Sequence, residues 1–218
     1  MMKDKVGLLL LLLFLVLILF VVKNNNGEYQ VGDLVKIGSE RFNVINVDDT
    51  TVTLLAKYNL GPDYRQSKKM NDVKFSDVAG WDWSYNSEPK EIDIQVWAPT
   101  IAAYINEYVL YLQKKTGDSS ITGNLPTMTQ LGELGCTINS DYKYEWPESY
   151  NNVRLNCKDS NYSKWLVNGQ DWWTRSVTTG ASGTVWSVKT VGGCYPSSHY
   201  GATNTIRPVI IVSKETLK

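Results

Sequence analysis

Histidine is almost absent from this 218-residue chain, in which His199 is the only one. A hydrolytic triad needs an imidazole held by an acid, and nothing around His199 or its neighbours Ser197 and Ser198 indicates such an acid. The phosphate-binding patterns GxxxxGK[ST] and GxGxxG are also missing. The sequence therefore predicts no catalytic residues, and we expect a protein that is not an enzyme.

A net charge is lacking as well, because 22 basic residues balance 22 acidic ones. Domains that bind nucleic acid usually carry a basic excess that meets the phosphates, so we expect no nucleic-acid partner. Aromatic residues, in contrast, are plentiful, with eight tryptophans and 13 tyrosines. Such side chains suit either a hydrophobic core or a stacking surface for sugars and peptides.

Cysteine is scarce, and the three cysteines form no CxxC pair that would predict a zinc site. If the domain is exported, Cys136 and Cys157 could form a disulfide, and closing that loop would stabilise the fold by about 3 kcal/mol. Three buried free thiols, with Cys194 as the third, are an equal alternative, since free cysteine is often buried.

The N-terminus carries the one long hydrophobic run, residues 6–22, interrupted only by Gly7. A helix of this length is about 26 Å long, close to the roughly 30 Å hydrocarbon core of a bilayer. No small-residue cleavage site follows, which favours an uncleaved signal anchor over a cleaved signal peptide. Lys3 and Lys5 precede the run and indicate a cytoplasmic N-terminus. We predict an anchor and tether in residues 1–27 and an extracellular domain in residues 28–218 of a single-pass membrane protein.

Alternating apolar residues at 29–37, 41–47 and 51–58 predict a three-stranded meander. Its predicted core residues are Phe42, Val44, Val52 and Leu54. Residues 100–115 have helical apolar spacing, preceded by Pro99 and followed by Gly117 as the C-cap. A second, short helix is expected after Pro126, with Thr127 and Gln130 in a capping box.

Residues 59–99 show little periodicity and include Trp81 and Trp83. A stretch of this length without clear elements is typical of a functional loop, which makes it one candidate ligand surface. Alternatively, the two tryptophans pin the loop to the core.

Three apolar or β-branched runs near the C-terminus, residues 172–177, 184–188 and 206–212, predict antiparallel strands. The last run is almost wholly aliphatic and should be a central strand buried on both faces. Arg207 lies within it, and so buried a cation needs a carboxylate or carbonyl partner. We expect Arg207, Trp172, Trp173 and Arg175 to be structural. Residues 165–167 indicate another strand or buried turn.

The pattern Trp172-Trp173-x-Arg175-Ser176, a strand with Trp186 and Val188, and the final Ile-Arg-Pro-Val together resemble a bacterial cell-surface family of unknown function. That family is similar to C-type lectins in fold and distantly similar to the formylglycine-generating (sulfatase-modifying) enzymes. Residues 123–127 resemble the helix entry of that superfamily, although Asn124 and Gln130 replace its usual arginine and glutamate.

The resemblance implies an α+β, C-type-lectin-like fold: an irregular antiparallel sheet with two flanking helices, its first strand paired with its last. Those enzymes bind copper through a C-terminal cysteine pair, of which this chain has only Cys194. The calcium loop of sugar-binding lectins is broken here by Lys90, a cation in place of an oxygen ligand. We therefore expect no metal and no cofactor.

The second candidate ligand surface is the segment 192–205, which has little to bury and is expected to be an exposed loop. Its candidate binding residues are Tyr195, His199, Tyr200 and Asn204, assisted by Trp81 and Trp83. An ordinary hairpin loop whose tyrosines cap the core is the alternative. The sequence thus favours a membrane-anchored extracellular module that recognises a glycan, peptide or protein. An enzyme derived from the sulfatase-modifying lineage and a purely structural envelope protein are the alternatives.

Overall fold

A computed structural model describes residues 29–69, 71–76, 90–138, 155–158, 160–177, 184–190 and 192–218. The chain divides into two units, Met1–Tyr29 with Lys218, and Gln30–Leu217, and the second holds nearly all of the described residues. Within those ranges, no helix is long and apolar enough to cross a membrane. The predicted anchor lies outside them, so the membrane segment stays a prediction.

The second unit is an α+β domain built mainly from antiparallel strands. Its first sheet has the order β1-β2-β3-β15-β8 and begins with the predicted meander, β1 (Leu34–Ile37), β2 (Glu40–Val47) and β3 (Thr51–Ala56). The four predicted core residues of the meander are all fully buried. The alternating pattern therefore predicts the strands and these core residues correctly. It does not show that β3 is buried on both faces, from Val52 to Ala56.

The last strand, β15 (Val209–Ser213), lies centrally between β3 and β8 (Thr122–Asn124), as the aliphatic run predicts. It is not buried on both faces throughout, because Ile211 is 43% exposed. The expected pairing of the first strand with the last is wrong. β15 pairs instead with β3, which offers it five consecutive partners, whereas the four-residue β1 pairs with β2 alone.

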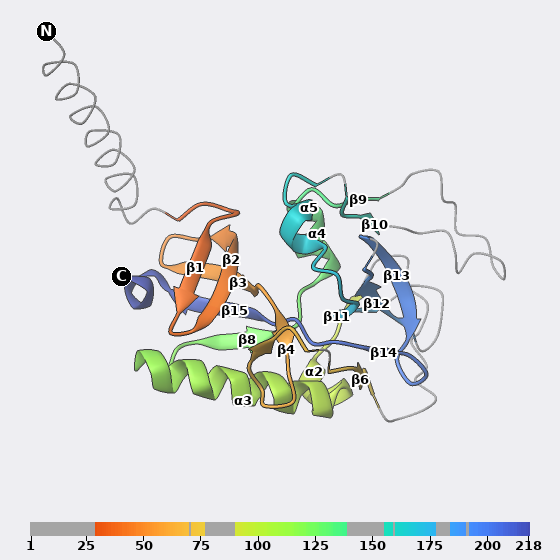
Figure 1. Cartoon of the computed structure of the whole chain (residues 1–218), viewed down its shortest axis with the longest axis horizontal. Helices are drawn as coiled ribbons and strands as arrows, with labels where there is room; N and C mark the ends of the chain where they lie inside the picture. The colour runs from red at the N-terminus through yellow and green to blue at the C-terminus, as the bar shows by residue number, and fades with distance from the viewer. Residues whose placement is uncertain are drawn as a thin grey trace, which may run out of the picture. The chain divides into compact units, whose positions relative to one another are not determined.

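Helix α3 (Pro99–Thr116) covers one face of this sheet (Figure 1) and confirms the clearest helix prediction. Its C-cap, Gly117, has φ 75°, a conformation that glycine adopts at low cost. The short helix α2 (Ile94–Trp97) packs beside it. Gly123 of β8 lets the helix approach closely, since a Cβ there would lie 2.6 Å from Val109 Cγ2.

The second sheet has the order β7-β11-β12-β13-β10-β9, and its three longest strands come from the C-terminal half. β11 (Trp172–Val177) and β12 (Thr184–Val188) match the predicted runs. The predicted exposed loop at residues 192–205 is wrong in its first part, because β13 (Gly193–Ser198) pairs there with β12 and β10. The remaining strands are short: β7 (Lys90–Glu91), β9 (Thr137–Ile138) and β10 (Leu155–Asn156).

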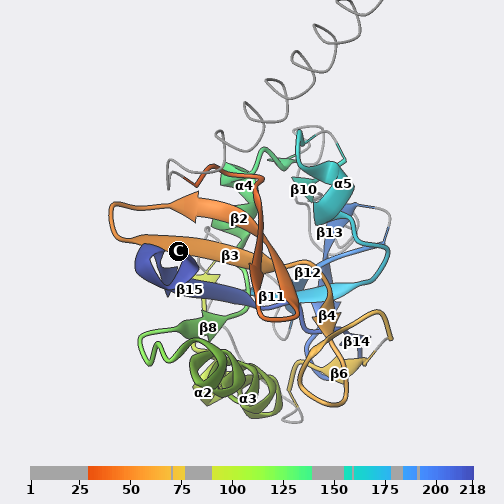
Figure 2. The same cartoon turned by 60° about the vertical axis from the view of Figure 1, so that its left-hand side comes forward.

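A cluster of buried side chains joins residues of both sheets to two short helices, α4 (Met128–Glu133) and α5 (Ser163–Leu166). Figure 2 shows the backbone of the two helices. α4 has the predicted capping box between Thr127 and Gln130. α5 replaces the strand or turn expected at residues 165–167, because Leu166 and Val167 bond back to Tyr162 and Ser163 as in a helix. The two helices, β11 to β13 and the first sheet thus all contribute side chains to this cluster.

Two further ladders are only two residues long and lie outside the main sheets. β4 (Asn59–Leu60) pairs with β5 (Gln66–Ser67). β6 (Val73–Lys74) pairs with β14 (Thr203–Asn204), joining the predicted long loop at residues 59–99 to the C-terminal stretch.

A 3-10 turn, Lys214–Leu217, follows the last strand and precedes the final residue, Lys218.

Candidate functional site

Among the described side chains of the predicted ligand segment, the exposed ones lie in the turn between β13 and β14 and at the two strand ends that flank it. The backbone of this turn is held locally, since Gly201 N donates to Ser198 Oγ at 3.0 Å and Ala202 N donates to the Ser198 carbonyl at 3.1 Å. It is also held from outside, because Ser76 N donates to the His199 carbonyl at 3.0 Å. The turn is therefore fixed at both ends by hydrogen bonds.

Tyr200 projects from this turn and is 47% exposed. The ammonium of Lys74, on the neighbouring strand β6, lies 4.9 Å from the centre of its ring. A cation at that distance is attracted to the face of the ring by about 0.5–1 kcal/mol at an exposed site. An aromatic ring and a positive charge therefore stand together at the surface.

Strand β6 is anchored beneath this pair by a buried tryptophan. Trp173 Nε1 donates to the Val73 carbonyl at 2.9 Å, and the Trp173 ring meets Phe75 edge to face at 5.4 Å. Both rings are fully buried. Lys74 thus stands on a strand whose position the core of the domain fixes.

Asn204, at the other end of the turn, is 1% exposed and only partly satisfied. Its Oδ1 accepts from Lys189 Nζ at 2.9 Å, whereas its buried Nδ2 has no hydrogen-bond partner within the described residues. Lys189 also pairs with Asp171 at 3.1 Å, and Asp171 Oδ1 accepts from Thr190 N at 2.7 Å. The ion pair is partly exposed, and its lysine lies against Asn204.

The sequence-predicted binding residues are therefore not one exposed set. Tyr200 is at the surface, but His199 and Asn204 are buried, because β14 pairs with β6 and folds them inward. Tyr195 lies within β13, paired with Ser187, and its side chain is outside the described set. Trp81 and Trp83 also lie outside the described residues.

Lys74, Lys189 and Asp171 were not singled out from the sequence. Lys74 belongs to a two-residue strand with no apolar alternation, and the partners of Lys189 are 15 and 18 residues away. No local pattern predicts these positions, since only the folded chain places Lys74 beside Tyr200 and Lys189 beside Asn204.

Arg207 has the carbonyl partners that its burial requires. Its guanidinium is fully buried and donates to the carbonyls of Ala56 at 2.8 Å, Leu166 at 2.9 Å and Trp165 at 2.7 Å. Burial lowers the pKa of Arg207 to about 9, which still leaves it charged at neutral pH. Its guanidinium also lies 5.3 Å from the centre of the buried Trp172 ring. These hydrogen bonds connect the start of the last strand to α5 and β3, which is a structural role.

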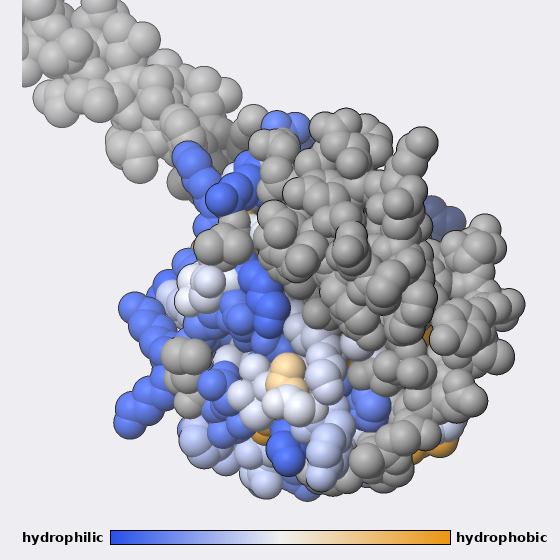
Figure 3. All heavy atoms as spheres, turned by 90° about the vertical axis from the view of Figure 1, so that its right-hand side faces the viewer, coloured by the Kyte–Doolittle hydropathy of each residue, from blue (hydrophilic) through white to orange (hydrophobic). Residues whose placement is uncertain are grey.

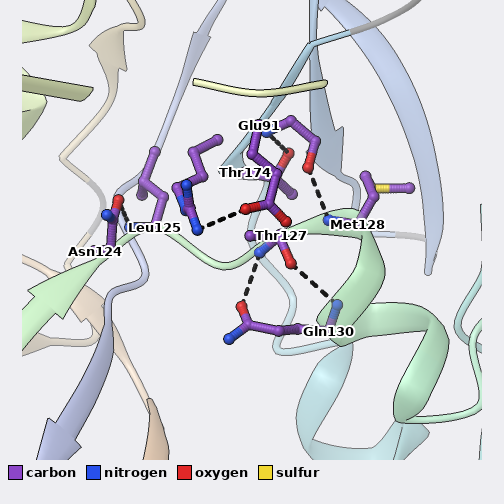
Figure 4. A network of polar contacts seen from close by, with 9 residues as sticks. Glu91, Asn124, Leu125, Thr127, Met128, Gln130 and Thr174 are labelled. Carbon is purple, nitrogen blue, oxygen red and sulfur yellow. Dashed lines mark hydrogen bonds and ion pairs between the residues drawn. The ribbon is translucent and has the colours of Figure 1, made fainter. Parts of the chain in front are cut away.

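Arg175 belongs to a polar network around the start of α4. Figure 4 shows this network, with Glu91, Met128 and the capping-box residues labelled. It forms an ion pair with Glu91 at 2.7 Å, and its backbone N donates to the Pro126 carbonyl at 3.0 Å. The next residue, Ser176, accepts from Met128 N at 2.9 Å. This network connects β7 and β11 to the capping box, so these contacts too are those of a structural role.

The cysteines lie together in the buried cluster. Cys136 and Cys157 form a disulfide, the pair that the sequence offered as one alternative, and Cys194 is a buried free thiol. Burial raises the pKa of the Cys194 thiol to about 12. The described residues contain no group of three or more His, Cys, Asp or Glu side chains that could hold a metal ion.

The surface on the side of the second sheet is mainly hydrophilic where its residues are described, with isolated hydrophobic positions (Figure 3). Comparison with known protein families, with curated proteins and with solved structures found no match to this chain.

Proposed function

We propose that this chain is a membrane-anchored extracellular recognition module without catalytic activity, and that its domain is C-type-lectin-like. Support for the fold comes from the α+β, mainly antiparallel architecture and from a late strand, β15, that returns to the middle of the N-terminal sheet. The apolar run at residues 6–22 supports the anchor.

The observation that carries the proposal is Tyr200 beside Lys74. Rigid aromatic side chains on a well-held turn give contact area at a low entropic cost, which is the composition of many binding loops. The neighbouring Ser198, Gly201 and Ala202 hold the turn and leave the ring accessible.

The chemistry of the pair indicates the kind of ligand. A sugar ring or a peptide side chain can stack on the tyrosine, while the ammonium of Lys74 favours an anionic group next to it. We therefore propose an acidic ligand, either a glycan with a carboxylate or a peptide with acidic residues.

The test uses the full-length chain in detergent on arrays of neutral and acidic glycans and peptides. Tyr200→Ala should weaken binding by roughly 30-fold, the cost of losing a hot spot of about 2 kcal/mol, at an unchanged melting temperature. Lys74→Met should weaken binding of acidic ligands only.

Leu110→Ala is the matched control, since Leu110 is also exposed but lies on α3. It should bind like the wild type. If Tyr200→Ala binds normally, or if it lowers the melting temperature, the turn is structural and the proposed site is wrong. Binding to no array member at all would favour a structural envelope protein.

A further inference from the structure

The three cysteines are brought together by the edge of the second sheet. β10 lies between β9 and β13. Cys136 comes directly before β9, Cys157 directly after β10, and Cys194 lies within β13. Cys157 therefore stands between two other cysteines that come from opposite sides.

The sulfur of Cys157 lies close to the sulfurs of both other cysteines. Its Sγ is bonded to Cys136, and the Sγ of the free Cys194 lies only 3.9 Å away. A disulfide has sulfurs about 2.05 Å apart, so an approach of about 1.9 Å would join Cys157 to Cys194. All three side chains are buried in the same hydrophobic cluster, where thiols from solution have little access.

We propose that Cys157 is a shared disulfide site with two alternative partners, Cys136 and Cys194, between which the bond exchanges within the chain. The Cys194 thiol loses its proton, and the thiolate attacks Cys157 Sγ. The Cys157–Cys194 bond forms as the Cys136–Cys157 bond breaks, and Cys136 leaves with the electron pair and takes up a proton. No net oxidation occurs, so no outside oxidant or reductant is needed.

The exchange would move a covalent link across the sheet. In the described state the link ties the end of α4 to β10. After exchange it would tie β10 to β13, and Cys136 would be the free thiol. Because burial raises the pKa of Cys194 to about 12, the reactive thiolate is rare at neutral pH and becomes more common as the pH rises.

Disulfide mapping of the full-length chain tests the exchange. The protein is incubated near pH 7 or at about pH 10, quenched with acid, denatured, alkylated and mapped by mass spectrometry. We expect alkylation of Cys194 after the neutral incubation, and a growing share of alkylated Cys136 with a Cys157–Cys194 bond after the alkaline one. Alkylation of Cys194 alone under both conditions overturns the proposal.

Three variants separate exchange from other causes. Cys194→Ser should keep its Cys136–Cys157 bond at both pH values, so alkylated Cys136 in this variant would reveal reduction instead of exchange. Cys136→Ser, refolded from denaturant with glutathione disulfide, which is reduced to two glutathione thiols, should form the Cys157–Cys194 bond. If both of its thiols stay free, the second pairing is wrong.

Cys157→Ser is the matched control for that oxidation. It leaves Cys136, directly before β9, and Cys194, within β13, on opposite sides of β10 and about two strand spacings or roughly 9.6 Å apart. A disulfide needs Cα atoms within about 7 Å, so both thiols should stay free in this variant. A Cys136–Cys194 bond would show that any two of the cysteines can pair. Cys157 would then not be a disulfide site shared by two partners, and the proposal would be wrong.

Discussion

Arg207 and Asn204 are two buried polar residues that differ in how well the fold satisfies them. Both side chains are almost completely removed from solvent. Arg207 donates to three carbonyls, whereas the Nδ2 of Asn204 has no partner within the described residues. A satisfied buried group stabilises a fold, and an unsatisfied one costs about 1–3 kcal/mol. Arg207 therefore stabilises the domain, whereas Asn204 destabilises it at a position next to the candidate surface.

The largest effect is expected at Arg207. Arg207→Met keeps much of the side-chain volume but leaves three carbonyls without their donor, so we expect a loss of about 3 kcal/mol in the free energy of unfolding. Chemical denaturation followed by tryptophan fluorescence measures it. Arg207→Lys should recover part of the loss, because an ammonium can serve only some of the acceptors. A Met variant as stable as the wild type would contradict the structural role.

A smaller effect of opposite sign is expected at Asn204. Asn204→Leu removes the orphaned amide, so the free energy of unfolding should rise by about 1 kcal/mol. Asn59→Leu is the matched control, because Asn59 is also buried but bonds through both ends of its amide, donating to Gln170 and Thr205 and accepting from Asn168.

The same substitution at Asn59 should therefore lower the free energy of unfolding by about 2–3 kcal/mol. Thermal and chemical denaturation of the two variants side by side give the comparison. If both asparagine variants lose stability equally, Asn204 is better satisfied than the structure indicates, and the contrast with Arg207 disappears.

The smallest effect is expected at Lys189, which connects Asn204 to Asp171. Its ion pair is partly exposed, and such pairs stabilise proteins by only about 0.2–1 kcal/mol. Lys189→Met should therefore lower the free energy of unfolding by less than about 1 kcal/mol, and salt should reduce the difference from the wild type. A larger loss that salt does not change would place Lys189 among the structural residues with Arg207.

The sequence by itself determined the elements whose signals are local. The meander follows from alternation over a few residues, and α3 from apolar spacing between Pro99 and Gly117. The short helix α4 follows from the capping box of Thr127 and Gln130, which are three residues apart. In each case the residues that decide the structure are neighbours in the chain, so a pattern reveals them.

The sequence also indicated that Arg207 needs a partner, but not which one. Only the tertiary structure decided that, since the Ala56 carbonyl is 151 residues away. It likewise selected the Cys136–Cys157 disulfide from two open alternatives and left Cys194 beside it.

The candidate site depended most on the tertiary structure. The segment 192–205 lacks apolar alternation, and the sequence therefore suggested a loop. Its first part is a strand because β12 and β10 supply backbone partners on both sides. Asn204 is buried where β14 pairs with β6, whereas Tyr200, in the turn before β14, stays exposed. Backbone hydrogen bonds do not depend on the side-chain pattern. The composition therefore indicated the tyrosine as a binding residue, but only the pairing of distant strands determined that it is exposed.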